Sequence, residues 1–166
     1  ELKIDGKRFP LLANDPPNHL HGGKESIDRR VWQAEVIPRF DGAPSLRLFT
    51  ISANGDNGYP GSVELAVTYT VTSDNRLVCE TEARSDSRTP VSLTHHSYFN
   101  LAGEATGTTD DHEVVILSEA AFCADEKMGL TGECRSVEGQ ANDARRARRM
   151  GDFLSLIHIS EPTRRI

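Results

Sequence analysis

The stretch VELAVTYTV, residues 63–71, alternates apolar or aromatic side chains with polar ones along most of its length. Because successive side chains of a β-strand point to opposite faces, this period of two predicts a half-buried strand. The residues SDNR at 73–76 are typical of a turn, and a second strand-like run, LVCETEA, begins at Leu77. The two runs and the turn between them therefore predict an antiparallel β-hairpin.

Other short runs along the chain also have the pattern of strands, and Gly, Pro, Asn or Asp residues separate them. Asp5-Gly6 is a dipeptide that a type I′ turn favours, so we expect a tight hairpin there. No amphipathic helix is evident before residue 140, and we therefore expect an all-β chain, a sandwich or barrel of many strands. The further runs are RVWQAEVI at 30–37, SLRLFTIS at 45–52, TPVSLTHHSYFNL at 89–101 and EVVILS at 113–118.

Composition narrows the classes of function. A length of 166 residues suits one domain, and a formal charge of -6 argues against a nucleic acid or an anionic membrane as partner. No apolar run is long enough to span a membrane. The cysteines are widely spaced and form no C-x-x-C pair, so we expect neither disulfides nor a zinc knuckle, and we expect a reducing, cytoplasmic location. They are Cys79, Cys123 and Cys134.

The run VSLTHHSYFNL at 91–101 is the first candidate site. If it is a strand, one face carries apolar side chains and the other carries Ser, Thr, His, Tyr and Asn. His96 falls on the polar face, together with Tyr98 and Asn100, whereas His95 falls on the apolar face. Such a polar face suits hydrogen bonding to a polyhydroxylated ligand, although a strand histidine can equally be structural.

A metal site is a second reading of the histidines. His19-x-His21 with Glu25, followed by His96, superficially mimics the metal-ligand motifs of cupins, whose ligands suit iron, manganese or zinc. The glycines and the proline that form the tight turns of those motifs are missing, and the two motifs lie unusually far apart. We therefore expect no metal. The residues at the positions concerned are Ala13, Trp32, Val91 and Leu93.

Six segments follow one another along the chain: NHLHGG at 18–23, RRVWQ at 29–33, NGYPG at 57–61, TPVSLTHHSYFNL at 89–101, TGE at 131–133 and NDARRARRMGD at 142–152. Taken in this order, they resemble the aldose 1-epimerase family, also called galactose mutarotases. The resemblance runs from about residue 2 to about residue 152. It implies a large antiparallel β-sandwich that binds a hexose and a reaction that interconverts the α and β anomers of aldoses such as galactose or glucose.

The resemblance also implies roles for individual residues. The family's general acid, the histidine of H-S-Y-F-N-L, falls on His96. Its other catalytic histidine, that of L-H-G-G, falls on His21, which is expected to hydrogen-bond the sugar and help hold the developing charge. Tyr98 is expected at the sugar-binding surface, and His19 is expected to be a loop neighbour. The reaction moves protons to and from the sugar, so no cofactor is expected.

The chain also departs from the family pattern. The family's catalytic glutamate and a substrate-binding aspartate lie beyond the point where the match ends, and its early arginine lies before Glu1. The glutamates at 104, 113, 119, 126 and 133 match no motif for the base. We therefore expect a domain truncated at both ends, with residues 1–152 as its matching part and residues 153–166, FLSLIHISEPTRRI, as a tail foreign to the family.

Two alternatives remain open from the sequence. The chain could be a carbohydrate-binding β-sandwich without catalysis, which a missing base would leave. ARRARR at 144–149 could be a basic nucleic-acid patch, but its match to a family loop and the acidic chain favour a solvated loop. The expected partner is a small aldose sugar.

Overall fold

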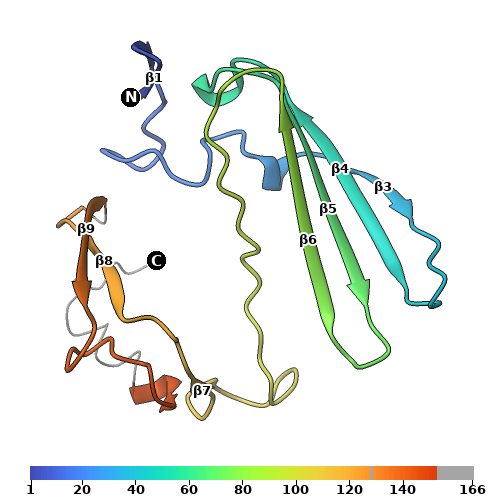
Figure 1. Ribbon diagram of the computed structural model, residues 1–166, viewed down its shortest axis with the longest axis vertical. Helices are drawn as coiled ribbons and strands as arrows, with labels where there is room; N and C mark the ends of the chain where they lie inside the picture. Colours follow the sequence, from blue (N-terminus) through green and yellow to red (C-terminus); the bar gives the residue numbers. More distant parts are fainter. Residues whose placement is uncertain (128, 153–166) are drawn as a thin grey trace. The chain divides into compact units, whose positions relative to one another are not determined.

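The computed structural model describes residues 1–127 and 129–152 and is almost entirely β-structure (Figure 1). The chain divides into two compact units, one from Glu1 to Thr94 and the other from His95 onward. All paired strands within the described residues are antiparallel. The predicted all-β, antiparallel fold class is therefore confirmed.

The first unit is built on a four-stranded sheet with the order β3-β4-β5-β6 (Figure 1). Its strands are β3 (Gln33–Val36), β4 (Ser45–Ser52), β5 (Val63–Val71) and β6 (Leu77–Ser85). The predicted hairpin of β5 and β6 is confirmed, with Val71 opposite Leu77 and Val63 opposite Ser85. The turn is closed by Thr72 N–H donating to the Arg76 carbonyl at 2.9 Å, with Asn75 in the left-handed region at φ 61°.

The alternation expected along β5 holds at its start and fails at its end. Val63 and Leu65 are buried and Glu64 is exposed, but polar Thr70 is 3% exposed and apolar Val71 is 51% exposed. Thr70 tolerates burial because its hydroxyl lies 2.9 Å from the Ser45 hydroxyl on the paired strand β4. A cross-strand hydrogen bond therefore overrides the hydrophobic pattern at this end of the sheet.

The predicted N-terminal hairpin is also present. β1 (Leu2–Ile4) pairs with β2 (Lys7–Phe9), and the turn residues Asp5 and Gly6 have φ 49° and 76°. Two consecutive positive φ angles are what a type I′ turn requires. Two short 3-10 helices, η1 (Ile27–Arg29) and η2 (Asp56–Gly58), complete the elements of the first unit.

The second unit contains two small antiparallel pairs. β7 (Glu113–Val114) pairs with β10 (Arg148–Arg149), and β8 (Ala120–Ala124) pairs with β9 (Leu130–Ser136) through a bulge. The predicted strand at 113–118 is therefore only two residues long. Part of the basic run at 144–149, expected to be a loop, is the strand β10.

The prediction of a strand at residues 89–101 is wrong. No strand is assigned there, and Val91, His95, His96 and Phe99 are all exposed. The reason is that a strand needs a neighbour with which to exchange backbone hydrogen bonds, and no strand within the described residues forms a ladder with this segment. Periodicity recognises the strand-forming composition but not the missing neighbour.

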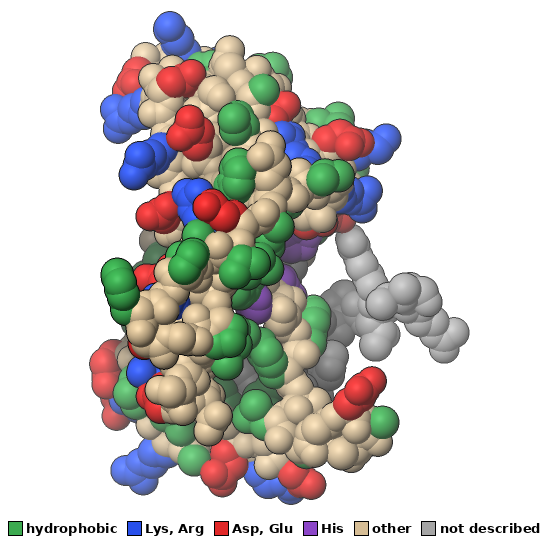
Figure 2. All heavy atoms as spheres, turned by 90° about the vertical axis from the view of Figure 1, so that its right-hand side faces the viewer, with side chains coloured by type: hydrophobic (Ala, Val, Ile, Leu, Met, Phe, Trp, Pro, Cys, Tyr) green, Lys and Arg blue, Asp and Glu red, His purple; other side chains and the backbone are tan. Residues whose placement is uncertain are grey.

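The apolar core of the described residues is small. Large apolar side chains remain exposed in both units, among them Val36 and Phe40 in the first and Leu117 in the second, and Figure 2 shows such side chains among the charged ones at the surface. Residues 1–127 and 129–152 contain no helix long and apolar enough to cross a membrane. The buried apolar residues are Val63, Leu65, Ala66, Val137 and Ala144.

Candidate functional site

His21 lies in an unusual turn of the first unit. Three consecutive residues, His21, Gly22 and Gly23, have positive φ angles of 52°, 77° and 104°, and the His21 side chain is exposed. Glycine adopts such angles freely, whereas a residue with a Cβ does so at a cost. The sequence L-H-G-G therefore supplies the backbone freedom that the turn needs on the C-terminal side of His21.

Two asparagine side chains hold the backbone on either side of this turn. Asn14 accepts from Leu20 N–H and donates to the Leu20 carbonyl, both at 2.9 Å. Asn57 accepts from Glu25 N–H at 3.2 Å and donates to the Glu25 carbonyl at 3.1 Å. Each carboxamide thus pairs with one backbone residue as a strand neighbour would, so the segment that carries His21 is fixed at both ends.

An ion pair between Arg30 and Asp56 also holds the loop that carries His21. Arg30 lies 2.7 Å from Asp56, and its guanidinium also donates to the carbonyls of Ile51 and Glu25 at 3.1 and 3.3 Å. Burial alone would raise the pKa of Asp56, but hydrogen bonds from Arg30, Ala53 N–H and the Ser52 hydroxyl outweigh it. The pKa of this carboxyl group therefore lies below its ordinary value.

The depressed pKa of Asp56 predicts that the His21 loop weakens in acid. A lowered carboxyl pKa contributes stability above the ordinary value of 3.8, and this contribution is lost as the pH falls through the lowered pKa. We expect the protection of the amides at residues 25–30, which is their exchange rate relative to the intrinsic rate at the same pH, to fall as the pH drops below 3.8. In Asp56→Asn this pH-dependent loss of protection should be absent, and the same loss in that variant would contradict the prediction.

His19 has a structural role in this loop. Its Nδ1 lies 2.7 Å from the Leu12 carbonyl, so Nδ1 carries the proton, and the ring meets Tyr59 edge-on with centroids 5.4 Å apart. The Nε2 atom is buried and has no hydrogen-bond partner among the described residues. His19 thus anchors the start of the loop, whereas His21 is exposed.

A carboxylate near His21 was not foreseen from the sequence. The pKa of Asp28 lies below its ordinary value, mainly because the Ser26 hydroxyl donates to this carboxylate, with smaller contributions from the charges of Arg29 and His21. His21 therefore lies within electrostatic reach of an acidic side chain seven positions along the chain. The sequence signal for this hydrogen bond was a serine two positions before an aspartate, Ser26 and Asp28.

His96 and Tyr98 lie together in the second unit. Their ring centroids are 5.2 Å apart with planes inclined by 42°, and both side chains are exposed. His95 has different neighbours: its Nε2 lies 3.4 Å from the Ser97 hydroxyl, and its ring stacks with Phe99 at 6.3 Å. Each histidine thus contacts a side chain two positions further along the chain, Tyr98 for His96 and Ser97 for His95. His21 belongs to the first unit, and His96 and Tyr98 belong to the second.

A histidine that the sequence did not single out, His112, contacts the turn after Tyr98. His112 Nδ1 donates to the Thr109 carbonyl at 2.9 Å, and its Nε2 accepts from Leu101 N–H at 2.8 Å. Asn100 accepts from Ala102 N–H at 3.0 Å rather than facing a ligand with its carbonyl oxygen. His112 and Asn100 therefore shape the turn that follows His96 and Tyr98.

Two glutamates of the second unit, neither of which matches a motif for the catalytic base, lie close to arginines. Glu119 pairs with Arg145 at 2.8 Å, and Glu133 lies 3.8 Å from Arg135. Arg145 is also held by Asp143, whose pKa this guanidinium lowers well below its usual range. Among residues 1–127 and 129–152, no three His, Cys, Asp or Glu side chains form a group that could hold a metal ion.

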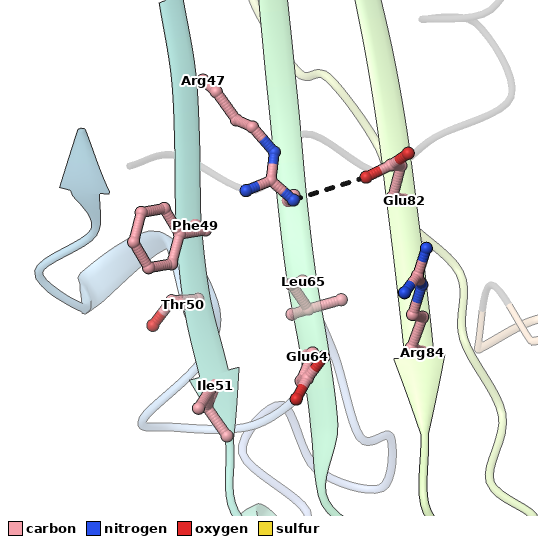
Figure 3. A pocket seen from close by; sticks show the side chains of 9 residues that line it. Arg47, Phe49, Thr50, Ile51, Glu64, Leu65, Glu82 and Arg84 are labelled. Carbon is pink, nitrogen blue, oxygen red and sulfur yellow. Dashed lines mark hydrogen bonds and ion pairs between the residues drawn. The ribbon is translucent and has the colours of Figure 1, made fainter. Parts of the chain in front are cut away.

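A hollow of about 330 Å³ lies on one face of the four-stranded sheet (Figure 3). Arg47 on β4 reaches toward Glu82 on β6 at 3.5 Å and lies over the Phe49 ring at 5.7 Å. Glu64 and Arg84 lie opposite each other on β5 and β6. The hollow is thus lined by charges of both signs, and none of the predicted site residues contributes to it.

Known proteins resemble this chain along nearly all of its length. Galactose mutarotase of Homo sapiens is 38% identical over 159 residues, which are 96% of this chain and 45% of that protein. Aldose 1-epimerase of Escherichia coli strain K12 is 35% identical over 146 residues, 87% of this chain and 40% of that protein. The chain therefore spans about half the length of the curated relatives it matches.

Comparison with solved structures gives the same result as comparison of sequences. The crystal structure of galactose 1-epimerase from Lactobacillus acidophilus NCFM has a TM-score of 0.83 at 28% identity, covering 95% of this chain and 47% of that one. The family model for aldose 1-epimerase matches residues 1–159, which include the segments of His21, His96 and Tyr98. This chain belongs to the aldose 1-epimerase family.

Proposed function

We propose that the chain is part of an aldose 1-epimerase that interconverts the α and β anomers of a hexose such as galactose or glucose. The observation that carries the proposal is the family match over residues 1–159, which includes both histidine segments in order. The exposed pair of His96 and Tyr98 supports it, because an imidazole beside a phenol suits a sugar with hydroxyl groups and a ring oxygen.

The proposed chemistry is proton transfer. An acid delivers a proton to the ring oxygen while a base removes the proton from the anomeric hydroxyl, and the ring opens to the aldehyde. Rotation about the C1–C2 bond exposes the other carbonyl face, and closure gives the other anomer. We assign the acid to His96, because imidazole exchanges protons near neutral pH. Sugar binding is assigned to His21, His96 and Tyr98, and no cofactor is required.

We further propose that residues 1–152 are part of the epimerase domain and that the catalytic base is a residue outside this range. The proposed tail at 153–166 lies outside the described residues. A cytoplasmic location is proposed on the three cysteines, which are all free thiols. The exposed apolar side chains of both units support the need for further packing partners.

A hybrid protein tests the function. Residues 1–152 would replace the matching part of human galactose mutarotase, and polarimetry would follow freshly dissolved α-D-galactose and α-D-glucose. We expect the hybrid to accelerate mutarotation and the 166-residue chain alone to match buffer. A hybrid that folds, as judged by circular dichroism and cooperative unfolding, but does not accelerate mutarotation would contradict the proposal and favour sugar binding without catalysis.

A further inference from the structure

We propose that Asn57 is the positioning residue for His21, acting through the backbone of Gly23 and Glu25. This inference rests on the proposed function, in which His21 grips the sugar. Asn57 lies 36 positions after His21 and opens the segment NGYPG at 57–61, but the family resemblance assigned no role to this residue. What singles it out is the set of contacts that its side chain makes with the loop.

The first contact is a two-point hydrogen bond. The Asn57 carboxamide accepts from Glu25 N–H at 3.2 Å and donates to the Glu25 carbonyl at 3.1 Å. Both backbone groups of one residue are thereby satisfied by a single planar side chain, which restrains the position and the orientation of that residue together. The Glu25 carbonyl also accepts from Arg30 at 3.3 Å, so this point of the loop is held from two sides.

The second contact is steric. Gly23 is buried, and a Cβ built there would lie 2.5 to 2.7 Å from the Oδ1, Cγ and Cβ atoms of Asn57. The Asn57 side chain therefore occupies the space that any other residue at position 23 would fill. Gly23 and Glu25 follow His21 by two and four positions, so Asn57 fixes the turn immediately beyond the histidine.

The conformation of His21 explains why such support is needed. A histidine at φ 52° is held in a sparsely populated region, which persists only where the surroundings determine it. Asn14 fixes Leu20 on one side, and Asn57 fixes Glu25 on the other. The segment that carries His21 is thus held by hydrogen bonds on both sides of the histidine, as a pre-organised binding group requires.

The test substitution is Asn57→Gly. Asn57 itself has φ 49°, which glycine adopts without strain, so the substitution removes the carboxamide and leaves the backbone conformation accessible. The matched control is Asn75→Gly. Asn75 has φ 61° in the exposed turn between β5 and β6, so it loses the same side chain from a similar backbone conformation far along the chain from His21.

Two measurements on the 166-residue chain decide the inference without any activity. In Asn57→Gly we expect the Glu25 amide to exchange about tenfold faster or more, because it loses its acceptor. We also expect the NMR signals of the His21 ring, assigned by their loss in His21→Gln, to shift and broaden. Asn75→Gly should change neither, and amides of β4 and β5 should keep their protection in both variants.

A third variant and the hybrid complete the test. Asn57→Asp keeps an acceptor for Glu25 N–H and should restore part of the protection. In the hybrid, Asn57→Gly should lower kcat/KM about tenfold, mostly through KM. Unchanged Glu25 exchange and unchanged His21 signals in Asn57→Gly would overturn the inference. A hybrid without mutarotase activity would count against the proposed function, while the exchange and NMR results would still decide the role of Asn57.

Discussion

In the hybrid enzyme, His96→Ala is expected to lower kcat by about 10²- to 10⁴-fold, the usual contribution of a well-placed general acid. Ring opening leaves negative charge on the ring oxygen unless a proton arrives as the bond breaks. Alanine cannot supply it, and water would have to replace an imidazole held beside Tyr98. Polarimetry at saturating sugar gives the change in kcat directly.

His95→Ala is the matched control, because it removes an adjacent imidazole that is also exposed. The His95 ring contacts Ser97 and Phe99 rather than Tyr98, so we expect its loss to change kcat less than tenfold. Equal losses in the two variants would mean that the segment is sensitive to packing alone. A larger loss in His95→Ala would reverse the assignment of the acid.

Gly58→Ala is expected to destabilise the fold by about 3 kcal/mol or more. Gly58 has φ +91°, and an L-residue in the left-handed region costs about 1–2 kcal/mol. In addition, a Cβ there would lie 2.3 Å from the Pro10 carbonyl oxygen, and relief of such overpacking costs a further ~1–3 kcal/mol. Because the obstacle is backbone, rotation of a side chain cannot remove the clash.

The control for this prediction is Gly55→Ala in the same turn. Gly55 has φ +90°, but nothing lies within 4 Å of the Cβ that would be added, so it carries the conformational cost without the clash. Urea unfolding of both variants should therefore show a larger loss for Gly58→Ala. Equal losses would contradict the prediction, because they would show that the clash of the new Cβ with the Pro10 carbonyl oxygen costs no stability.

The sequence by itself determined the strands whose neighbours follow closely along the chain. β4 and β5 were predicted with their observed bounds, because alternation and the flanking turn residues are local signals. The Asp5-Gly6 turn was equally predictable, since its backbone angles depend on two residues only. Membership of the family also followed from the order of short segments, each of which is legible without a structure.

Only the tertiary structure decided how the candidate site is supported. Residues 89–101 have the composition of a strand, yet the pairing that makes a strand depends on a distant neighbour. The hairpin of β8 and β9 was missed because neither run alternates apolar and polar residues as β5 does, and β9 is exposed throughout. The hold of Asn57 on Glu25 joins residues 32 positions apart, and that of Arg30 on Asp56 joins residues 26 positions apart. No local pattern encodes such contacts, because they form only when the chain folds back and brings a polar side chain against an unpaired backbone group or an opposite charge.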